Sequence, residues 1–322
     1  MEKFAYANPT TEKEAFGLLG PDAAVLAGGT DLISSMKELI ATPKTVVNVK
    51  GIKSLGGIAT GRNGMRIGAT VTLDELAENA AVRKAFPSLT EAALGITSPQ
   101  IRNMGTVGGD LLQRPRCWYY RQGFGLLAMQ NGKSLVPDGE NRYHAILNNK
   151  GPAYFVSPSS LAPALIALNA TIRLHSAAGL RDVPAEKFFI TPLNEQTRET
   201  AIQPNEILAE ILIPTAPTAN ATYEVRQKEA LDWPLATASV ALKMSGNRIS
   251  SARVVLGHVA PVPFSAIAAD KYLAGKSLND NTAAEAAKEA LMSATPLSQN
   301  AYKVQLARVA VKRALLAAVK KA

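Results

Sequence analysis

The sequence predicts an α+β protein built from three successive units. Short strand-like and helical segments alternate over residues 1–57 and 58–215, whereas residues 222–322 contain three strand-like runs followed by Ala-rich helical runs. Alternating strands and helices are typical of mixed α/β units, and strands followed by helices are typical of an α+β arrangement. We therefore expect two α/β subdomains and a separate C-terminal domain.

The first unit is predicted to be a small subdomain that ends near the glycine pair at 56–57. Pro9 and Thr10 precede a helical pattern, which is where helices commonly begin. The β-branched pair Val46 and Val47 favours a strand. The expected elements are a helix at 11–19, a strand at 23–26, a helix at 31–39 and a strand at 45–49.

The second unit is predicted to be larger and to contain a long insertion. Thr72 stands where a helix N-cap is expected. Residues 114–150 are expected to be a loop-rich insertion. The other expected elements are strands at 65–67 and 70–71, helices at 73–79, 89–94 and 161–168, a strand at 171–175 and a closing segment at 211–214.

The third unit is predicted to be a three-stranded antiparallel sheet with helices. Three runs of strand-forming residues follow one another closely, as in a meander. The strands are expected at 223–227, 236–244 and 249–258, and the helices at 264–274, 281–293 and 301–319.

The composition excludes several classes of protein. The formal net charge is +9, but the basic residues are scattered, so nucleic-acid binding is not expected. No apolar run approaches the ~20 residues of a membrane span. The first residues, 1–6, lack the basic and apolar regions of an export signal. Cys117 is the only cysteine, which excludes an intrachain disulfide and a four-cysteine cluster on this chain.

Two Gly-Gly segments are the most informative feature of the sequence. They are LAGGTDL at 26–32 and RNMGTVGGDL at 102–111, and each has a Thr beside the glycines and an Asp after them. We predict that both are turns preceded by strand-like residues. Successive backbone N–H groups in such turns bind phosphate oxygens, so the pair could hold a dinucleotide diphosphate. Neither segment matches a P-loop or a Rossmann fingerprint, and each alone could be an ordinary turn.

The residues beside the glycines have more than one possible role. The hydroxyls of Thr30 and Thr106 could donate to phosphate, or these residues could simply end a strand. A carboxylate repels a diphosphate, so Asp31 and Asp110 are expected to face a ribose hydroxyl, a backbone N–H or a helix start.

The chain resembles the flavin-binding medium subunits of the molybdenum hydroxylases, the family of xanthine dehydrogenase, aldehyde oxidoreductase and carbon monoxide dehydrogenase. Besides the two Gly-Gly segments, the resemblance rests on IGATVTLDEL at 67–76, FVSPSSLAPALIALNATIRL at 155–174, NEILAEILIP at 205–214, RQKEALDWPLATASVAL at 226–242 and NAYKVQLARVAVKRAL at 300–315. Segments 116–121 and 139–145 resemble a subgroup that carries a four-iron cluster in the insertion, but the cluster cysteines are missing here.

The resemblance implies a two-subdomain FAD-binding domain of the p-cresol methylhydroxylase/vanillyl-alcohol oxidase type and a C-terminal domain like that of carbon monoxide dehydrogenase flavoprotein. It implies one noncovalent FAD, with the isoalloxazine ring near Asp232, although Asp232-Trp233-Pro234 could also be a plain turn. No catalytic residue and no metal ligand is expected on the chain. The expected FAD-binding residues are Leu26, Ala27, Gly28, Gly29, Thr30, Asp31, Leu32, Thr106, Gly108, Gly109, Asp110, Glu140, His144, Leu208, Lys228 and Asp232.

The function implied is that of an electron-transfer subunit. Electrons would come from a molybdenum-cofactor large subunit through an iron–sulfur small subunit to FAD, and then to a terminal acceptor. The alternatives are a self-sufficient FAD oxidase and a cofactor-free assembly subunit. The expected location is cytoplasmic, or periplasmic by co-export with a signal-bearing partner.

Overall fold

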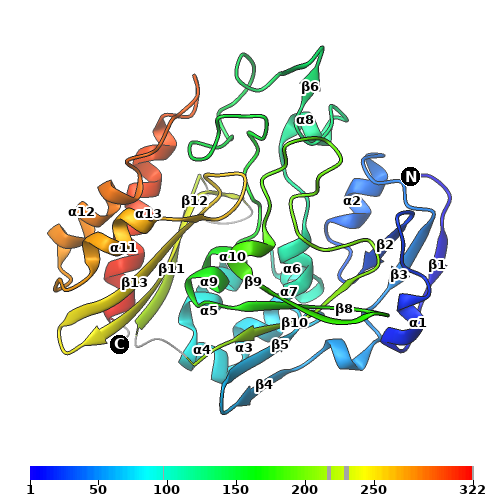
Figure 1. Cartoon of the computed structure of the whole chain (residues 1–322), viewed down its shortest axis with the longest axis horizontal. Helices are drawn as coiled ribbons and strands as arrows, with labels where there is room; N and C mark the ends of the chain where they lie inside the picture. The colour runs from blue at the N-terminus through cyan, green and yellow to red at the C-terminus, as the bar shows by residue number, and fades with distance from the viewer. Residues whose placement is uncertain (97, 216–218, 228–231, 321–322) are drawn as a thin grey trace.

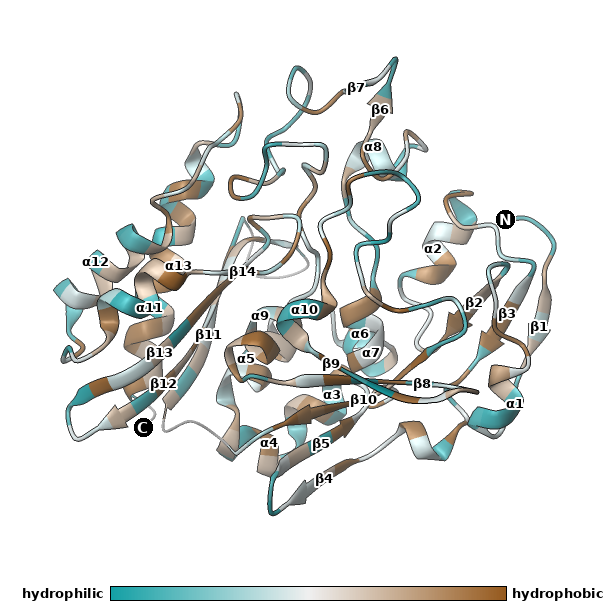
Figure 2. Cartoon of the chain, in the orientation of Figure 1, coloured by the Kyte–Doolittle hydropathy of each residue, from teal (hydrophilic) through white to brown (hydrophobic). Residues whose placement is uncertain are grey.

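The computed structural model describes residues 1–96, 98–215, 219–227 and 232–320 (Figure 1). Three sheets follow one another across the molecule, from the N-terminal end through the middle to the C-terminal end, and a small hairpin lies in the insertion. The predicted α+β class is confirmed. Hydrophobic residues are concentrated on inner strands such as β5 and β10, and the outer helix α12 is largely hydrophilic (Figure 2).

The first sheet is parallel, and the first Gly-Gly segment leaves it directly. The middle strand β3 is buried at Val46 and Val47, as expected for its β-branched residues. β2 ends at Leu26, so the glycines follow at the edge of the sheet. The elements are β1 (Ala5–Ala7), α1 (Glu12–Phe16), β2 (Ala23–Leu26), α2 (Leu32–Lys37), β3 (Thr45–Asn48) and a 3-10 turn (Lys53–Leu55).

The second sheet is antiparallel, in the order β4-β5-β10-β8-β9. Thr72 caps α3 through a capping box, in which its hydroxyl accepts from Glu75 N and the Glu75 carboxylate accepts from Thr72 N. The strands are β4 (Ile58–Gly61), β5 (Gly64–Gly68), β8 (Thr171–Ser176), β9 (Gly179–Pro184) and β10 (Ile207–Ile213). The helices are α3 (Leu73–Glu78), α4 (Ala80–Ala85), α5 (Pro87–Gly95), α6 (Pro99–Met104), α7 (Val107–Leu112), α9 (Leu161–Ala167) and α10 (Ala185–Phe188).

The second Gly-Gly segment is not a turn after a strand, so that prediction was wrong. It lies in the first turn of α7, and the preceding residues form α6. The reason is capping. Ser98 accepts from Ile101 N with Pro99 at the first helical position, and Thr106 accepts from Gly109 N. The strand expected at 70–71 is also absent, because β5 ends at Gly68.

The C-terminal domain contains the three predicted strands and the three predicted helices. A short strand, β14, adds to the sheet, which makes it four-stranded rather than three-stranded. The Ala-rich helix α13 buries small side chains against β11 and β12, and α12 packs against α13 and α11. The elements are β11 (Ala219–Arg226), β12 (Pro234–Ser245), β13 (Arg248–Gly257), β14 (Phe264–Ser265), α11 (Ile267–Leu273), α12 (Asp280–Ala290) and α13 (Tyr302–Lys320).

The insertion is mostly loop and projects between the first sheet and the C-terminal domain (Figure 1). Its regular elements are α8 (Trp118–Arg121), β6 (Met129–Gln130) and β7 (Lys133–Ser134). Hydrogen bonds hold its second half to the C-terminal domain: Asn141 Nδ2 donates to Ser298 Oγ (2.9 Å), and Asn300 Nδ2 donates to His144 O (3.2 Å).

Candidate functional site

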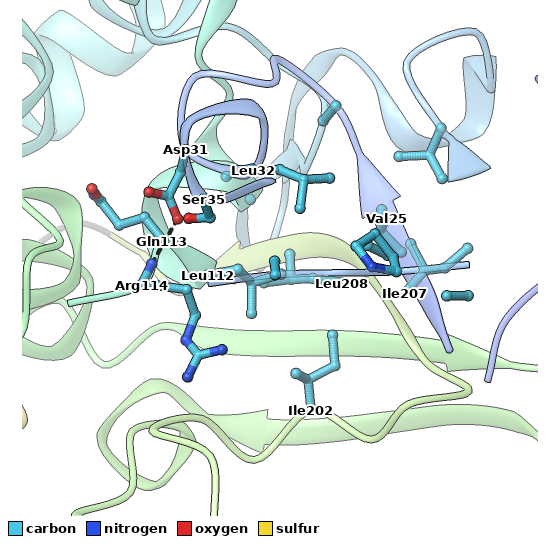
Figure 3. Close-up of a pocket in the computed structure, with 18 of the residues that line it drawn as sticks. Val25, Asp31, Leu32, Ser35, Leu112, Gln113, Arg114, Ile202, Ile207 and Leu208 are labelled. Carbon is cyan, nitrogen blue, oxygen red and sulfur yellow. Dashed lines mark hydrogen bonds between the residues drawn. The ribbon is translucent and has the colours of Figure 1, made fainter. Parts of the chain in front are cut away.

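A cleft of about 500 Å³ lies between the two Gly-Gly segments. Figure 3 shows Asp31 beside Arg114, with Ile207 and Leu208 of β10 along the same cleft. Ten of the residues predicted to bind the cofactor line it: Ala27, Gly28, Gly29, Thr30, Asp31, Leu32, Thr106, Gly108, Gly109 and Leu208. Leu26 and Asp110 lie directly beside these residues in the chain.

Close packing between the two segments explains Gly28. A Cβ atom at Gly28 would lie 2.0 Å from the backbone oxygen of Met104, which a real atom cannot do. Gly29 has a φ of +73°, a conformation that side chains disfavour. The first pair of glycines therefore turns the chain and lets it touch the α6–α7 connection.

The first segment presents unused backbone donors to the cleft. Within the described residues, the N–H groups of Gly29, Thr30, Asp31 and Leu32 donate to no protein acceptor. Thr30 is also exposed, so its hydroxyl is accessible beside them. A run of N–H groups at the start of a helix attracts an anion.

The second segment differs, because its N–H groups are already used. Val107 N donates to Val71 O and Gly108 N to Ala69 O, both at 2.9 Å, and Gly109 N donates to Thr106 Oγ1 at 3.1 Å. A Cβ at Gly108 would lie 2.9 Å from the Cβ of Ala69, whereas one at Gly109 would meet only Thr106 Oγ1. This segment therefore packs closely against residues 69–71 and forms one side of the cleft without free N–H donors.

Asp31 connects the first segment to the insertion. Its Oδ2 accepts from Arg114 N at 2.8 Å. Its Oδ1 lies 2.7 Å from Arg116 Nη1 and 2.9 Å from Arg121 Nη2. Of the roles expected for this carboxylate, the structure shows acceptance from a backbone N–H.

Asp110 points away from the cleft, into the protein. Its carboxylate accepts from Ser159 Oγ and from Leu161 N (3.1 Å) at the start of α9. Burial raises the pKa of Asp110 to about 6, against the lowering effect of these hydrogen bonds. The structure therefore places Asp110 at a helix start, one of the roles that its sequence context allowed.

Two family models together span nearly the whole chain. The model described as "FAD binding domain in molybdopterin dehydrogenase" matches residues 2–216, and the "CO dehydrogenase flavoprotein C-terminal domain" matches residues 221–318. The chain belongs to the FAD-binding medium subunits of the molybdenum hydroxylases.

Relatives in sequence and structure agree with this assignment. The carbon monoxide dehydrogenase medium chain of Hydrogenophaga pseudoflava is 31% identical over 98% of this chain and 97% of its own length. The aldehyde oxidoreductase FAD-binding subunit PaoB of Escherichia coli (strain K12) is 30% identical, covering 96% of each chain. A solved carbon monoxide dehydrogenase structure from H. pseudoflava matches with a TM-score of 0.77 and 29% identity, covering 99% of this chain and 98% of that one.

The residues of the cleft fit an FAD diphosphate. The free N–H groups of the first segment supply donors, and Gly109 leaves room where a side chain would fill the space. Two arginines, Arg114 and Arg198, line the cleft and carry positive charge. Arg114 Nε lies 2.5 Å from Glu199 Oε1, and burial lowers the pKa of Arg198.

The remaining predicted site residues lie elsewhere. His144 and Asp232 line a second cavity, and Glu140 is exposed, where it pairs with Arg142 at 2.9 Å. Lys228 lies outside the described residues. Among the described residues, no three His, Cys, Asp or Glu side chains are grouped as a metal site.

Sequence reasoning missed many polar residues that line the cleft, among them Gln113, Arg114, Tyr120, Arg198 and Gln203. The short distance of Gln113 and Arg114 from the second Gly-Gly segment is a signal that could have found two of them. Arg198 follows the insertion and comes from a loop, and no local pattern marks it.

Proposed function

We propose that the chain holds one FAD noncovalently in the cleft between the two Gly-Gly segments. The diphosphate lies against the N–H groups of residues 29–32, and the wall at 106–109 lies opposite. The observation that carries this proposal is the set of unused donors in the first segment. When bound, the flavin supplies the electron-transfer chemistry.

The chain's own residues bind and orient this cofactor. Arg114 and Arg198 share the buried carboxylate of Glu199, and the net positive charge that remains favours the diphosphate. Leu208, 4% exposed, supplies an apolar surface from β10 along the cleft. Asp31 acts through the insertion, whose first residues it holds in place, rather than on phosphate.

We infer that electrons reach this subunit from an iron–sulfur small subunit, which receives them from a molybdenum-cofactor large subunit. This inference is supported by the names of relatives, which are chains of carbon monoxide dehydrogenase and of aldehyde oxidoreductase. No helix among the described residues is long and apolar enough to cross a membrane. We propose a cytoplasmic location, with co-export alongside a signal-bearing partner as the alternative.

We retain residues 1–57, 58–215 and 222–322 as the proposed division into units, with the insertion at 114–150. The first two units form the FAD cleft, because both walls come from them. The third contributes Asp232 to the second cavity.

The test is the flavin content of a matched pair of variants. Gly109→Val introduces a branched side chain into the cleft, and Gly51→Val introduces the same side chain where no atom lies within 4 Å. The Gly51 variant should purify with the flavin absorption of the unmodified chain. The Gly109 variant should lose most of it while retaining the same circular dichroism. Full FAD in both variants would contradict the proposed site.

A further inference from the structure

The insertion is held at both ends, and the two ends are held on different parts of the chain. At its first end, Asp31 accepts from Arg114 N at 2.8 Å, and Arg121 Nη1 donates to Ser35 Oγ at 2.9 Å. Arg114 and Tyr120 of this end also line the proposed FAD cleft. The other end is held on the C-terminal domain, from which none of the described residues lines the cleft. The insertion therefore connects the cleft to a domain that does not form it.

Three side chains at or just before the start of α13 hold the second end of the insertion. Between them they donate to the backbone oxygens of five successive residues, 141–145. The contacts are Asn300 Nδ2 to Asn141 O (3.3 Å), His144 O (3.2 Å) and Ala145 O (3.2 Å), Tyr302 OH to Arg142 O (2.8 Å), and Lys303 Nζ to Tyr143 O and His144 O (both 3.2 Å). We call these contacts of Asn300, Tyr302 and Lys303 with the backbone of 141–145 the α13 clamp.

Lys303 is the buried cation of the α13 clamp. It is 1% exposed, and its Nζ also donates to His258 O at 2.7 Å, so three backbone oxygens surround the ammonium. In the described part of the chain, no carboxylate forms an ion pair with it. A lysine buried without a counter-ion is rare, because removing the ammonium from water costs free energy. Burial accordingly lowers the pKa of Lys303 to about 7.

The clamped end of the insertion packs against its first end. Glu140 N donates to Tyr119 OH at 2.7 Å. The rings of Trp118 and Tyr143 stack, with centroids 5.5 Å apart. Trp118 and Tyr119 belong to α8, which also carries the cleft residue Tyr120. A displacement of the clamped end is therefore transmitted through α8 to the edge of the cleft.

We propose that Lys303 is a positioning residue for FAD, which holds the insertion against the cleft through the α13 clamp and so slows release of the cofactor. This inference rests on the function proposed above. Lys303 does not line the cleft and acts only through the insertion. When the clamp opens, α8 and Tyr120 move away from the cleft and FAD leaves faster.

The α13 clamp should tighten as the pH rises above 7. In a released insertion, Lys303 would face water and regain the ordinary lysine pKa of 10.5, against about 7 in the clamp. The clamped state therefore binds fewer protons than the released state between these two values, and rising pH favours the clamped state. A contact that only supports the fold, without a titrating group, would not show this dependence.

The histidines and the cysteine near Lys303 do not titrate in the same range. Burial, aided by the charge of Lys303, lowers the pKa of His144 to about 4 and that of His258 to about 3, so both are neutral from pH 7 upwards. Burial raises the pKa of the Cys117 thiol, which keeps it protonated. A Lys303 variant leaves every other neighbouring group in place, and so isolates the lysine. The other titratable or charged groups on the surrounding elements are Arg116, Tyr143, Arg226, Asp232 and Tyr302.

The rate of FAD release tests the proposal. The full chain carrying FAD is diluted at pH 7 and at pH 8.5, and free FAD is separated at intervals and measured by absorption. Lys303→Met removes the titrating amine and its three hydrogen bonds. Lys312→Met makes the same change on the same helix, at a lysine that pairs with Asp280 instead.

We expect the unmodified chain and Lys312→Met to release FAD about tenfold more slowly at pH 8.5 than at pH 7. Lys303→Met should release FAD faster than the unmodified chain at pH 8.5, because three buried backbone oxygens lose their donor. Its rate should not change with pH. Equal rates in all three chains, or a pH dependence that persists in Lys303→Met, would overturn the proposal.

Amide hydrogen exchange in residues 139–145 reports the opening of the α13 clamp directly. Exchange is measured by mass spectrometry on the full chain and corrected for the intrinsic effect of pH on amide exchange. Opening should become rarer from pH 7 to pH 8.5 in the unmodified chain and should be frequent at both values in Lys303→Met. Should Lys303→Met fail to fold, the unmodified chain decides, since opening that is independent of pH would overturn the proposal.

Flavin content separates this inference from the proposed function. Normal flavin content with the same release rate in Lys303→Met and the unmodified chain overturns the role of the clamp and leaves the FAD cleft intact. Absence of flavin from the unmodified chain overturns the FAD cleft, and this inference with it.

Discussion

The two Gly-Gly segments share a Thr, a glycine pair and an Asp, yet they present different atoms to the same cleft. In the first, at 28–29, the following N–H groups are unused. In the second, at 108–109, helix α7 and its contacts with 69–71 consume them. Two similar sequences therefore have different roles. The first segment provides free N–H donors for an anion, and the second provides a closely packed surface without free donors. Substitutions that act differently on the two segments test this comparison.

The largest effect is expected at Gly28. Gly28→Ala places a Cβ against backbone atoms of Met104 and Gly105, which cannot rotate away. We expect a loss of about 3 kcal/mol or more of unfolding free energy. The partner variant Gly109→Ala meets only Thr106 Oγ1 within α7, so a change below about 1 kcal/mol is expected. Urea denaturation measures the unfolding free energy of both variants. Equal losses of stability in Gly28→Ala and Gly109→Ala would contradict the proposed difference between the two segments.

The carboxylates that follow the two glycine pairs differ in burial: Asp110 is buried, whereas Asp31 is only partly buried. The effect of pH on stability tests the burial of Asp110. Burial raises the pKa of Asp110 in the folded state to about 6, above the ordinary aspartate value of 3.8. The folded state therefore binds more protons between these values, and the stability contribution of Asp110 falls as pH rises through them. The unfolding free energy of the unmodified chain minus that of Asp110→Asn should fall by up to about 3 kcal/mol between pH 4 and 7. A flat difference would show that Asp110 is not buried as described.

Asp31 should instead act on the insertion. Asp31→Asn keeps an oxygen for Arg114 N but removes the charge that pairs with Arg116 and Arg121. We expect a loss of about 2 kcal/mol and faster proteolysis within 114–150. The exposed Asp138, in the insertion itself, provides the control Asp138→Asn, which should be neutral. Unchanged proteolysis in Asp31→Asn would contradict the connection.

The smallest effect is expected at Thr106, the N-cap of α7. Thr106→Val removes the oxygen that accepts from Gly109 N and should cost about 1 kcal/mol. Thr106→Ser keeps that oxygen and should retain most of the stability. If both variants bind FAD normally, the hydroxyl acts as a cap and not as an essential phosphate ligand. Loss of FAD in Thr106→Val alone, with stability unchanged, would show the reverse.

Sequence reasoning predicted the elements whose signals are local. The strands around Val46 and in β11 to β13, the capping box at Thr72 and the Ala-rich helices all follow from short-range patterns. The prediction of strand-like residues before the second glycine pair was wrong, because these residues form helices α6 and α7. Ser98 with Pro99 starts α6, and Thr106 caps α7.

The site was only partly predictable, for a similar reason. Both Gly-Gly segments lie in one cleft, as a ligand shared between them requires. The role of Gly28 depends on Met104, and that of Asp31 on Arg116 and Arg121, so tertiary contacts decide them. No local pattern in the chain records which N–H groups the fold leaves unused.

Amide hydrogen exchange with and without FAD tests the central difference most directly. Residue-resolved exchange, measured by NMR on the full chain, compares the amides of 29–32 with those of 107–109. We predict that FAD slows exchange strongly at 29–32, where the donors are unused. At 107–109, exchange should be slow already and should change little. FAD-dependent protection confined to 107–109 would contradict the account.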